Sequence, residues 1–168
     1  TPIFDFEESV RSSNSMTEEE MHYLRIVHFF VWAFWNLSFG RTLLEWIYNQ
    51  TGKNQLDVLT DLIKPGMNPE LDQFVSEYDT EARTEWFETP DTLIEYYTKN
   101  FDQLIADGFL KLNLKYLAKI LLDKKLAKLL IDAVIRQFPS PISTQLGKFC
   151  YDRIFFLDSS ISKKLKYD

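Results

Sequence analysis

The run from Ile26 to Phe39, IVHFFVWAFWNLSF, constrains the fold most, because it is apolar almost all the way round a helix. With 14 residues it is too short to cross a membrane, since a spanning helix needs about 20 apolar residues. Thr17 and Glu20 precede the run with the spacing of a helix capping box. A helix that is apolar on all sides is a buried one. We therefore expect one aromatic helix at the centre of the fold, wrapped by other helices.

Helical spacing of apolar residues, together with start and stop signals, predicts the remaining elements. The predicted helices cover about residues 17–36, 41–50, 54–64, 69–86, 90–107, 113–137 and 144–157. No stretch alternates as a strand does, and 5 Gly and 6 Pro leave few residues for the turns of a sheet. The expected class is all-α, an irregular or orthogonal bundle of six to seven helices. Residues 1–168 form a single domain, with an irregular lead-in at 1–16 and a flexible tail at 158–168.

The net charge of −6 conceals an uneven distribution along the chain. Residues 68–95 hold nine acids and one base, whereas residues 111–168 hold twelve bases and five acids. The two segments can attract each other across the fold, or they can be docking faces for another protein. We favour neither of these over the simpler interpretation that both segments are solvated faces. An acidic chain of this kind is not expected to bind nucleic acid.

No set of residues in the sequence points to a catalytic or metal centre. His22 and His28 are six apart and face different directions on one helix, and we expect His28 to be a core histidine. Asp57 and Asp61 form a carboxylate pair without a histidine, so a surface role is favoured over a metal site. Cys150 stands alone among apolar residues, which predicts a buried, unreactive thiol and a reducing, cytoplasmic location. A stand-alone enzyme is therefore the least favoured function.

The large aromatic side chains leave one candidate site open. Five of them could line an apolar ligand pocket or could simply be core, and we favour core. These residues are Phe30, Trp32, Trp35, Trp46 and Trp86. If the central helix is buried, Phe30→Ala or Trp35→Ala should each destabilise the chain by about 3–5 kcal/mol.

Two stretches of the sequence resemble a known family. The block MTEEEMHYLRIVHFFVWAFWNLSFGRTLLEW and the following GKNQLDVLTDLIK are similar to the helical C-terminal region of cobalamin-binding-type radical SAM proteins, which are related to the anaerobic magnesium-protoporphyrin monomethyl ester cyclase. The later ETPDTLIEYYTKNFDQLIADG is compatible with the same region. The family's CxxxCxxC loop and its Asp-x-His-x-x-Gly pattern are both missing from this sequence.

The resemblance implies an accessory C-terminal domain without catalytic, cofactor-binding or metal-binding residues of its own. Such a domain would shield the catalytic barrel of its parent chain or help to form the substrate pocket. S-adenosylmethionine, a 4Fe–4S cluster and cobalamin would belong to that parent chain. The start at Thr1 rather than Met agrees with an excised piece of a longer protein. The alternatives are a stand-alone helical protein-interaction module and a helical module that binds an apolar ligand.

Overall fold

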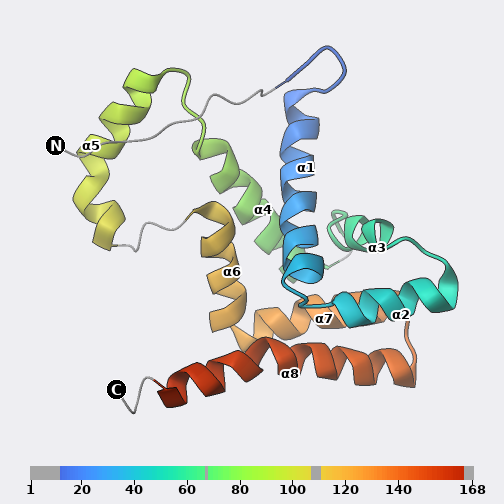
Figure 1. Ribbon diagram of the computed structural model, residues 1–168. Helices are drawn as coiled ribbons and strands as arrows, with labels where there is room; N and C mark the ends of the chain where they lie inside the picture. Colours follow the sequence, from blue (N-terminus) through green and yellow to red (C-terminus); the bar gives the residue numbers. More distant parts are fainter. Residues whose placement is uncertain (1–11, 67, 107–110, 165–168) are drawn as a thin grey trace.

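The computed structural model describes residues 12–66, 68–106 and 111–164, without the side chains of Glu70 and of residues 156–164. These residues form eight α-helices, one π-helical turn and no strand (Figure 1). The elements are α1 (Glu18–Val31), η1 (Trp32–Asn36), α2 (Arg41–Thr51), α3 (Gln55–Leu62), α4 (Pro69–Thr84), α5 (Pro90–Ala106), α6 (Leu112–Leu122), α7 (Lys124–Gln137) and α8 (Pro141–Lys164). The all-α class predicted from the sequence is confirmed.

The helices pack in two groups that meet at η1, through contacts of α3 with α2 and α7, and through contacts of α6 with α7. In the first group α1 stands upright between α3 and α4, and α6 packs against the outer side of α4 (Figure 1). In the second group α8 lies across the base beside α2 and α7 (Figure 1). Helix α5 stands away from both groups, at the far side of α4 and α6 (Figure 1).

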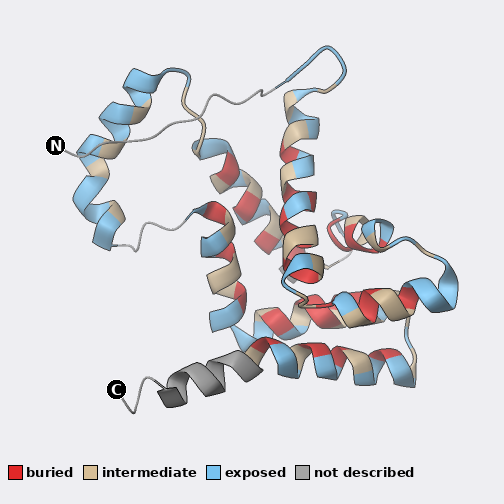
Figure 2. Cartoon of the chain, in the orientation of Figure 1, coloured by how far each residue is buried: buried red, intermediate tan, exposed pale blue. Residues whose placement is uncertain are grey.

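The core is centred on α1 and η1, as the aromatic run predicts. Phe29, Phe30, Ala33 and Phe34 are each almost completely buried, and the buried residues of Figure 2 continue from them into the lower helices. The capping box is also present, because Thr17 Oγ1 accepts from the Glu20 amide at 3.2 Å. The helix is not buried on every side, however, because residues such as Tyr23 and Leu24 are nearly half exposed.

The end of the central helix widens into the π-helical turn η1. The amide of Leu37 donates to the carbonyl of Trp32 at 2.9 Å, which closes a ring one residue wider than that of an α-helix. The chain then turns at Ser38, whose φ of 61° is in the left-handed region. This geometry keeps Ala33 and Phe34 inside and leaves Trp32 and Trp35 half-buried.

The predicted helix over 113–137 is wrong as a single element. Asp123 has an extended backbone, and its carboxylate accepts from the amides of Lys125 at 2.8 Å and Leu126 at 3.2 Å, so it ends α6 and caps α7. The described residues therefore contain eight α-helices rather than six to seven. At the other end of the chain, α8 continues to Lys164, past the predicted end at about residue 157.

The predicted lead-in and tail lie partly outside the described residues, namely 1–11 and 165–168. The described part of the lead-in is non-helical, with the amide of Ser13 donating to the carbonyl of Met16 at 2.8 Å. The flexibility predicted for residues 158–168 stays a prediction.

Candidate functional site

The five aromatic residues singled out from the sequence lie in different surroundings. Phe30 is in the core, where it stacks on Phe34. Trp35 and Trp46 are half-buried against the core, and Trp86 lies on the ring of His22, with the ring centroids 4.6 Å apart. Trp32 alone of the five lines a cavity that is bordered by α1 and α5.

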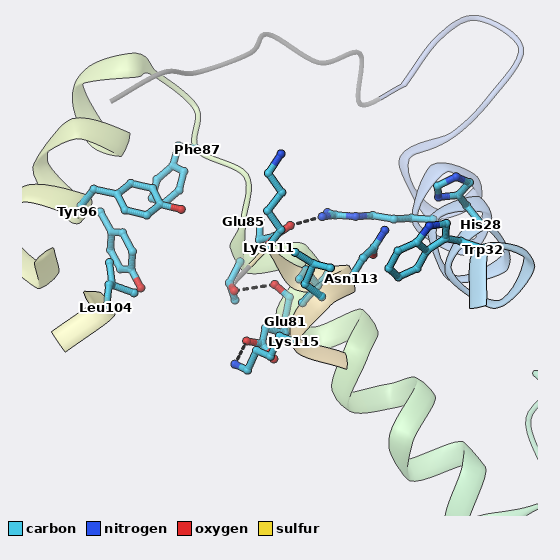
Figure 3. Close-up of a pocket in the computed structure, with 15 residues that line it drawn as sticks. His28, Trp32, Glu81, Glu85, Phe87, Tyr96, Leu104, Lys111, Asn113 and Lys115 are labelled. Carbon is cyan, nitrogen blue, oxygen red and sulfur yellow. Dashed lines mark hydrogen bonds and ion pairs between the residues drawn. The ribbon is translucent and has the colours of Figure 1, made fainter. Parts of the chain in front are cut away.

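That cavity, called here the α5 cleft, has a volume of about 720 Å³. Its walls come from α1, η1, the end of α4, the α4–α5 connection, α5 and the start of α6. Figure 3 shows Phe87, Tyr96 and Leu104 on one side of the cleft and His28 and Trp32 on the other. His28 is exposed there, so the prediction that it is a core histidine is wrong. His22, which lies on another side of α1, is the buried histidine.

The carboxylates of the α5 cleft are both paired with cations. Arg25 forms an ion pair with Glu85 and also donates to the carbonyl of Ala82 at 3.0 Å. Lys115 forms an ion pair with Glu81 (Figure 3). Lys111, which also lines the cleft, pairs with no carboxylate among the residues that the structure describes. The lining of the cleft thus carries a surplus positive charge in an acidic protein.

The acidic and basic segments of the sequence pair with each other where α4 meets α6. Glu77 lies 3.4 Å from the amine of Lys119, and the Glu81–Lys115 pair lies one turn further along both helices. The hydrogen bonds of Glu77 from Gln73 and Lys119 hold its pKa below its usual value. Attraction across the fold therefore involves some of the charged residues of both segments, in addition to the solvated faces favoured from the sequence.

A second charged group joins α1 to α4. Arg83 makes a bidentate contact with Glu19 at 2.8 and 2.7 Å and also donates to Asp79 at 2.9 Å. These contacts raise the pKa of Arg83 and lower that of Glu19. Beside them the buried His22 Nδ1 lies 3.9 Å from Asp79 Oδ1, and neither atom has a hydrogen-bond partner among the described residues.

No group of three or more metal-ligating side chains gathers in the described ranges. Cys150 is 2% exposed, and burial raises the pKa of its thiol, as expected of an unreactive cysteine. Asp61 forms ion pairs with Lys53 and Lys64, and the hydrogen bonds from both lysines lower the pKa of its carboxyl. The partners of Asp61 are therefore these lysines, in agreement with the surface role favoured for the Asp57 and Asp61 pair.

Helix α5 carries an unusual apolar surface, called here the α5 apolar face. It consists of Leu93, Ile94, Tyr97, Phe101, Leu104 and Ile105, which are spaced three or four residues apart. None of the 17 residues of α5, all of which the structure describes, is buried (Figure 2). Tyr97 and Leu104 line the α5 cleft, whereas Ile94 and Ile105, on the other edge, are 42% and 58% exposed.

The sequence predicted the apolar spacing of α5 but not its exposure, and it did not select Arg25, Lys111 or Tyr96 as site residues. These three side chains come from different helices or helix ends, and only the tertiary arrangement brings them to one cleft. No local pattern marks them.

Comparison with known protein families, with curated proteins and with solved structures finds no match to this chain. The resemblance to the radical SAM proteins therefore stays a prediction from the residues quoted above. No described helix combines the length and the apolarity that crossing a lipid bilayer requires.

Proposed function

We propose that this chain is a helical docking domain without catalysis of its own, and that the docking edge of its α5 apolar face, the edge that carries Ile94 and Ile105, packs against another protein domain. The observation that carries the proposal is the exposure of Ile94 and Ile105 on a 17-residue amphipathic helix that has no buried residue. Most of the stability of a helix in a protein comes from burying its apolar face. Helix α5 receives only part of that contribution, because none of its 17 described residues is buried, so a second surface that covers it would stabilise it.

The charges of α5 indicate the chemistry of that second surface. Asp91, Glu95 and Asp102 are exposed on α5, against the single base Lys99. On a helical projection Asp91 and Asp102 border the edge that carries Ile94 and Ile105. The complementary surface is therefore apolar at its centre and carries Lys or Arg at its rim.

The resemblance gives the proposal its particular form. The covered domain is then the catalytic barrel of a radical SAM enzyme in the same parent chain, which the helical domain shields or whose substrate pocket it helps to form. S-adenosylmethionine, a 4Fe–4S cluster and cobalamin would be held by that barrel, in the cytoplasm. In the second form of the proposal, the chain is a stand-alone interaction module, an irregular helical bundle whose partner is a separate protein.

Photo-crosslinking in the native cells tests the docking function. We would place benzoylphenylalanine at Ile94 or Ile105 in the product of the whole reading frame, with Lys99 on the opposite side of α5 as the matched control position. We expect both isoleucine positions to crosslink to one apolar surface with a basic rim. We expect no crosslink from position 99. Equal crosslinking from the two sides of α5 would overturn the proposal.

The reading frame itself separates the two forms of the proposal. A CxxxCxxC motif in a region of alternating strands and helices upstream of Thr1 supports the radical SAM form, because three cysteines of that spacing hold the iron–sulfur cluster. A reading frame without this motif overturns that form. The crosslinked partner then identifies the protein that the interaction module binds.

A further inference from the structure

The α5 cleft has the properties of a ligand site that is separate from the docking edge of α5. Its volume of about 720 Å³ is within the usual range of small-molecule sites, which is roughly 300–1,000 Å³. Its walls combine charged and polar side chains with aromatic and apolar ones, and Trp32 lies opposite Phe87, Tyr96 and Leu104 (Figure 3). The aromatic side chains favour a ligand with an apolar body.

The charges in the cleft indicate the head group of that ligand. Because Arg25 and Lys115 already neutralise Glu85 and Glu81, Lys111 is the lining cation that is left over among the described residues. Lys111 is exposed and stands immediately before α6. It is the N-cap residue of α6, so the positive end of that helix lies next to it. A single negative charge is complementary to this corner.

We propose that the α5 cleft binds an amphiphilic ligand that has an apolar body and one carboxylate or similar anionic head, with the head at Lys111 and the body between Trp32 and Tyr96. This site goes beyond the docking function, because Ile94 and Ile105 of the docking edge do not line the cleft. It also differs from the pocket considered from the sequence, since it includes only one of the four tryptophans.

Isothermal titration calorimetry of this chain with three probes tests the site. Dodecanoate has the apolar body and the anionic head, dodecanol has the same body without the charge, and 1-naphthoate has a planar ring with the same head. We expect dodecanoate to bind at least about tenfold more tightly than dodecanol, as a charge-assisted contact allows. Comparison of dodecanoate with 1-naphthoate then distinguishes a chain-like ligand from an aromatic one.

Two charge reversals locate the head group. Lys111→Glu should weaken dodecanoate binding at least about tenfold and leave dodecanol binding unchanged. Lys99→Glu, on the polar side of α5 and outside the cleft, should leave both unchanged. Both lysines are exposed, so circular dichroism should show the same helix content in both variants.

Equal affinity for the acid and the alcohol would overturn the proposal, as would no binding of any probe. The proposal would also be overturned if Lys111→Glu and Lys99→Glu changed the affinity for dodecanoate equally. Failure here is distinguishable from failure of the docking function, because the crosslinking experiment probes Ile94 and Ile105 instead.

Discussion

Truncation of Phe30 tests the arrangement of the core, and its cost can be worked from the structure. Phe30 is 1% exposed. Its ring meets Phe29 edge to face at 5.6 Å and Phe74 edge to face at 6.4 Å, and it stacks on Phe34 at 6.2 Å. A buried Phe→Ala change costs about 3–5 kcal/mol through lost transfer energy and the cavity that remains. The three ring contacts place Phe30→Ala in the upper half of that range.

Trp35→Ala is the matched comparison, because the sequence alone predicts the same cost for both residues. In the structure Trp35 is only half-buried, and its ring lies 4.8 Å from the guanidinium of Arg41 on the outside of η1. Its removal should therefore cost less, about 1–2 kcal/mol, for part of its apolar area and one exposed cation–π contact. His28→Ala, on the exposed side of α1, is the surface control.

Urea unfolding followed by circular dichroism at 222 nm measures these differences, provided that the slope with denaturant stays the same. For a chain of this size about 1 kcal/mol corresponds to roughly 2–4 °C in Tm. The reasoning is refuted if Trp35→Ala destabilises the protein as much as Phe30→Ala, or if Phe30→Ala is no worse than His28→Ala.

Two further predictions concern packing and pH. A Cβ at Gly147 would lie 3.1 Å from Ile131 and closer still to Ile135. Gly147→Ala should therefore force α7 and α8 apart and lower the free energy of unfolding by about 1–3 kcal/mol. The same urea titration measures this loss, and an unchanged midpoint would contradict the α7–α8 contact. Burial raises the pKa of Tyr78 from 10.0 to about 12. The neutral phenol is thus favoured by folding, so its contribution is complete below pH 10 and is lost as the pH rises from 10 to about 12. Stability should fall over that window, and absorbance at 295 nm should show that Tyr78→Phe removes one late-titrating tyrosine; no difference between the two titrations would contradict its burial.

Local signals in the sequence predicted most helix boundaries correctly. Thr17 and Glu20 form the predicted capping box, and Gly52, with a φ of 73°, ends α2 as a left-handed cap. The start signals before Pro69 and Pro90 also stand at the first residues of α4 and α5. These features depend on residues a few positions apart, so the sequence contains all that is needed to predict them.

The buried faces were harder to predict when a helix is apolar on more than one side. In α6 Leu114 and Leu121 are exposed, whereas Tyr116 and Ile120 are buried. Tyr116 is buried because its ring packs edge to face on Phe74 and Tyr78, which belong to α4. That burial depends on a neighbour that is distant in sequence.

The candidate site could not be predicted for the same reason. His28 sits in the most apolar run of the chain, yet it faces the α5 cleft because α5 stands away from α1. The separation of α5 depends on the packing of whole helices, and periodicity along a single helix carries no information about it.

The central claim, that a second protein surface covers the docking edge of α5, is tested most directly by amide hydrogen exchange over Pro90–Ala106. The exchange would be measured in this chain alone and in the native assembly isolated from the cells that produce it. The account predicts that the α5 amides exchange at least about tenfold more slowly in the assembly, while the amides of α1 keep their rates. Equal exchange of α5 in the two samples would contradict it.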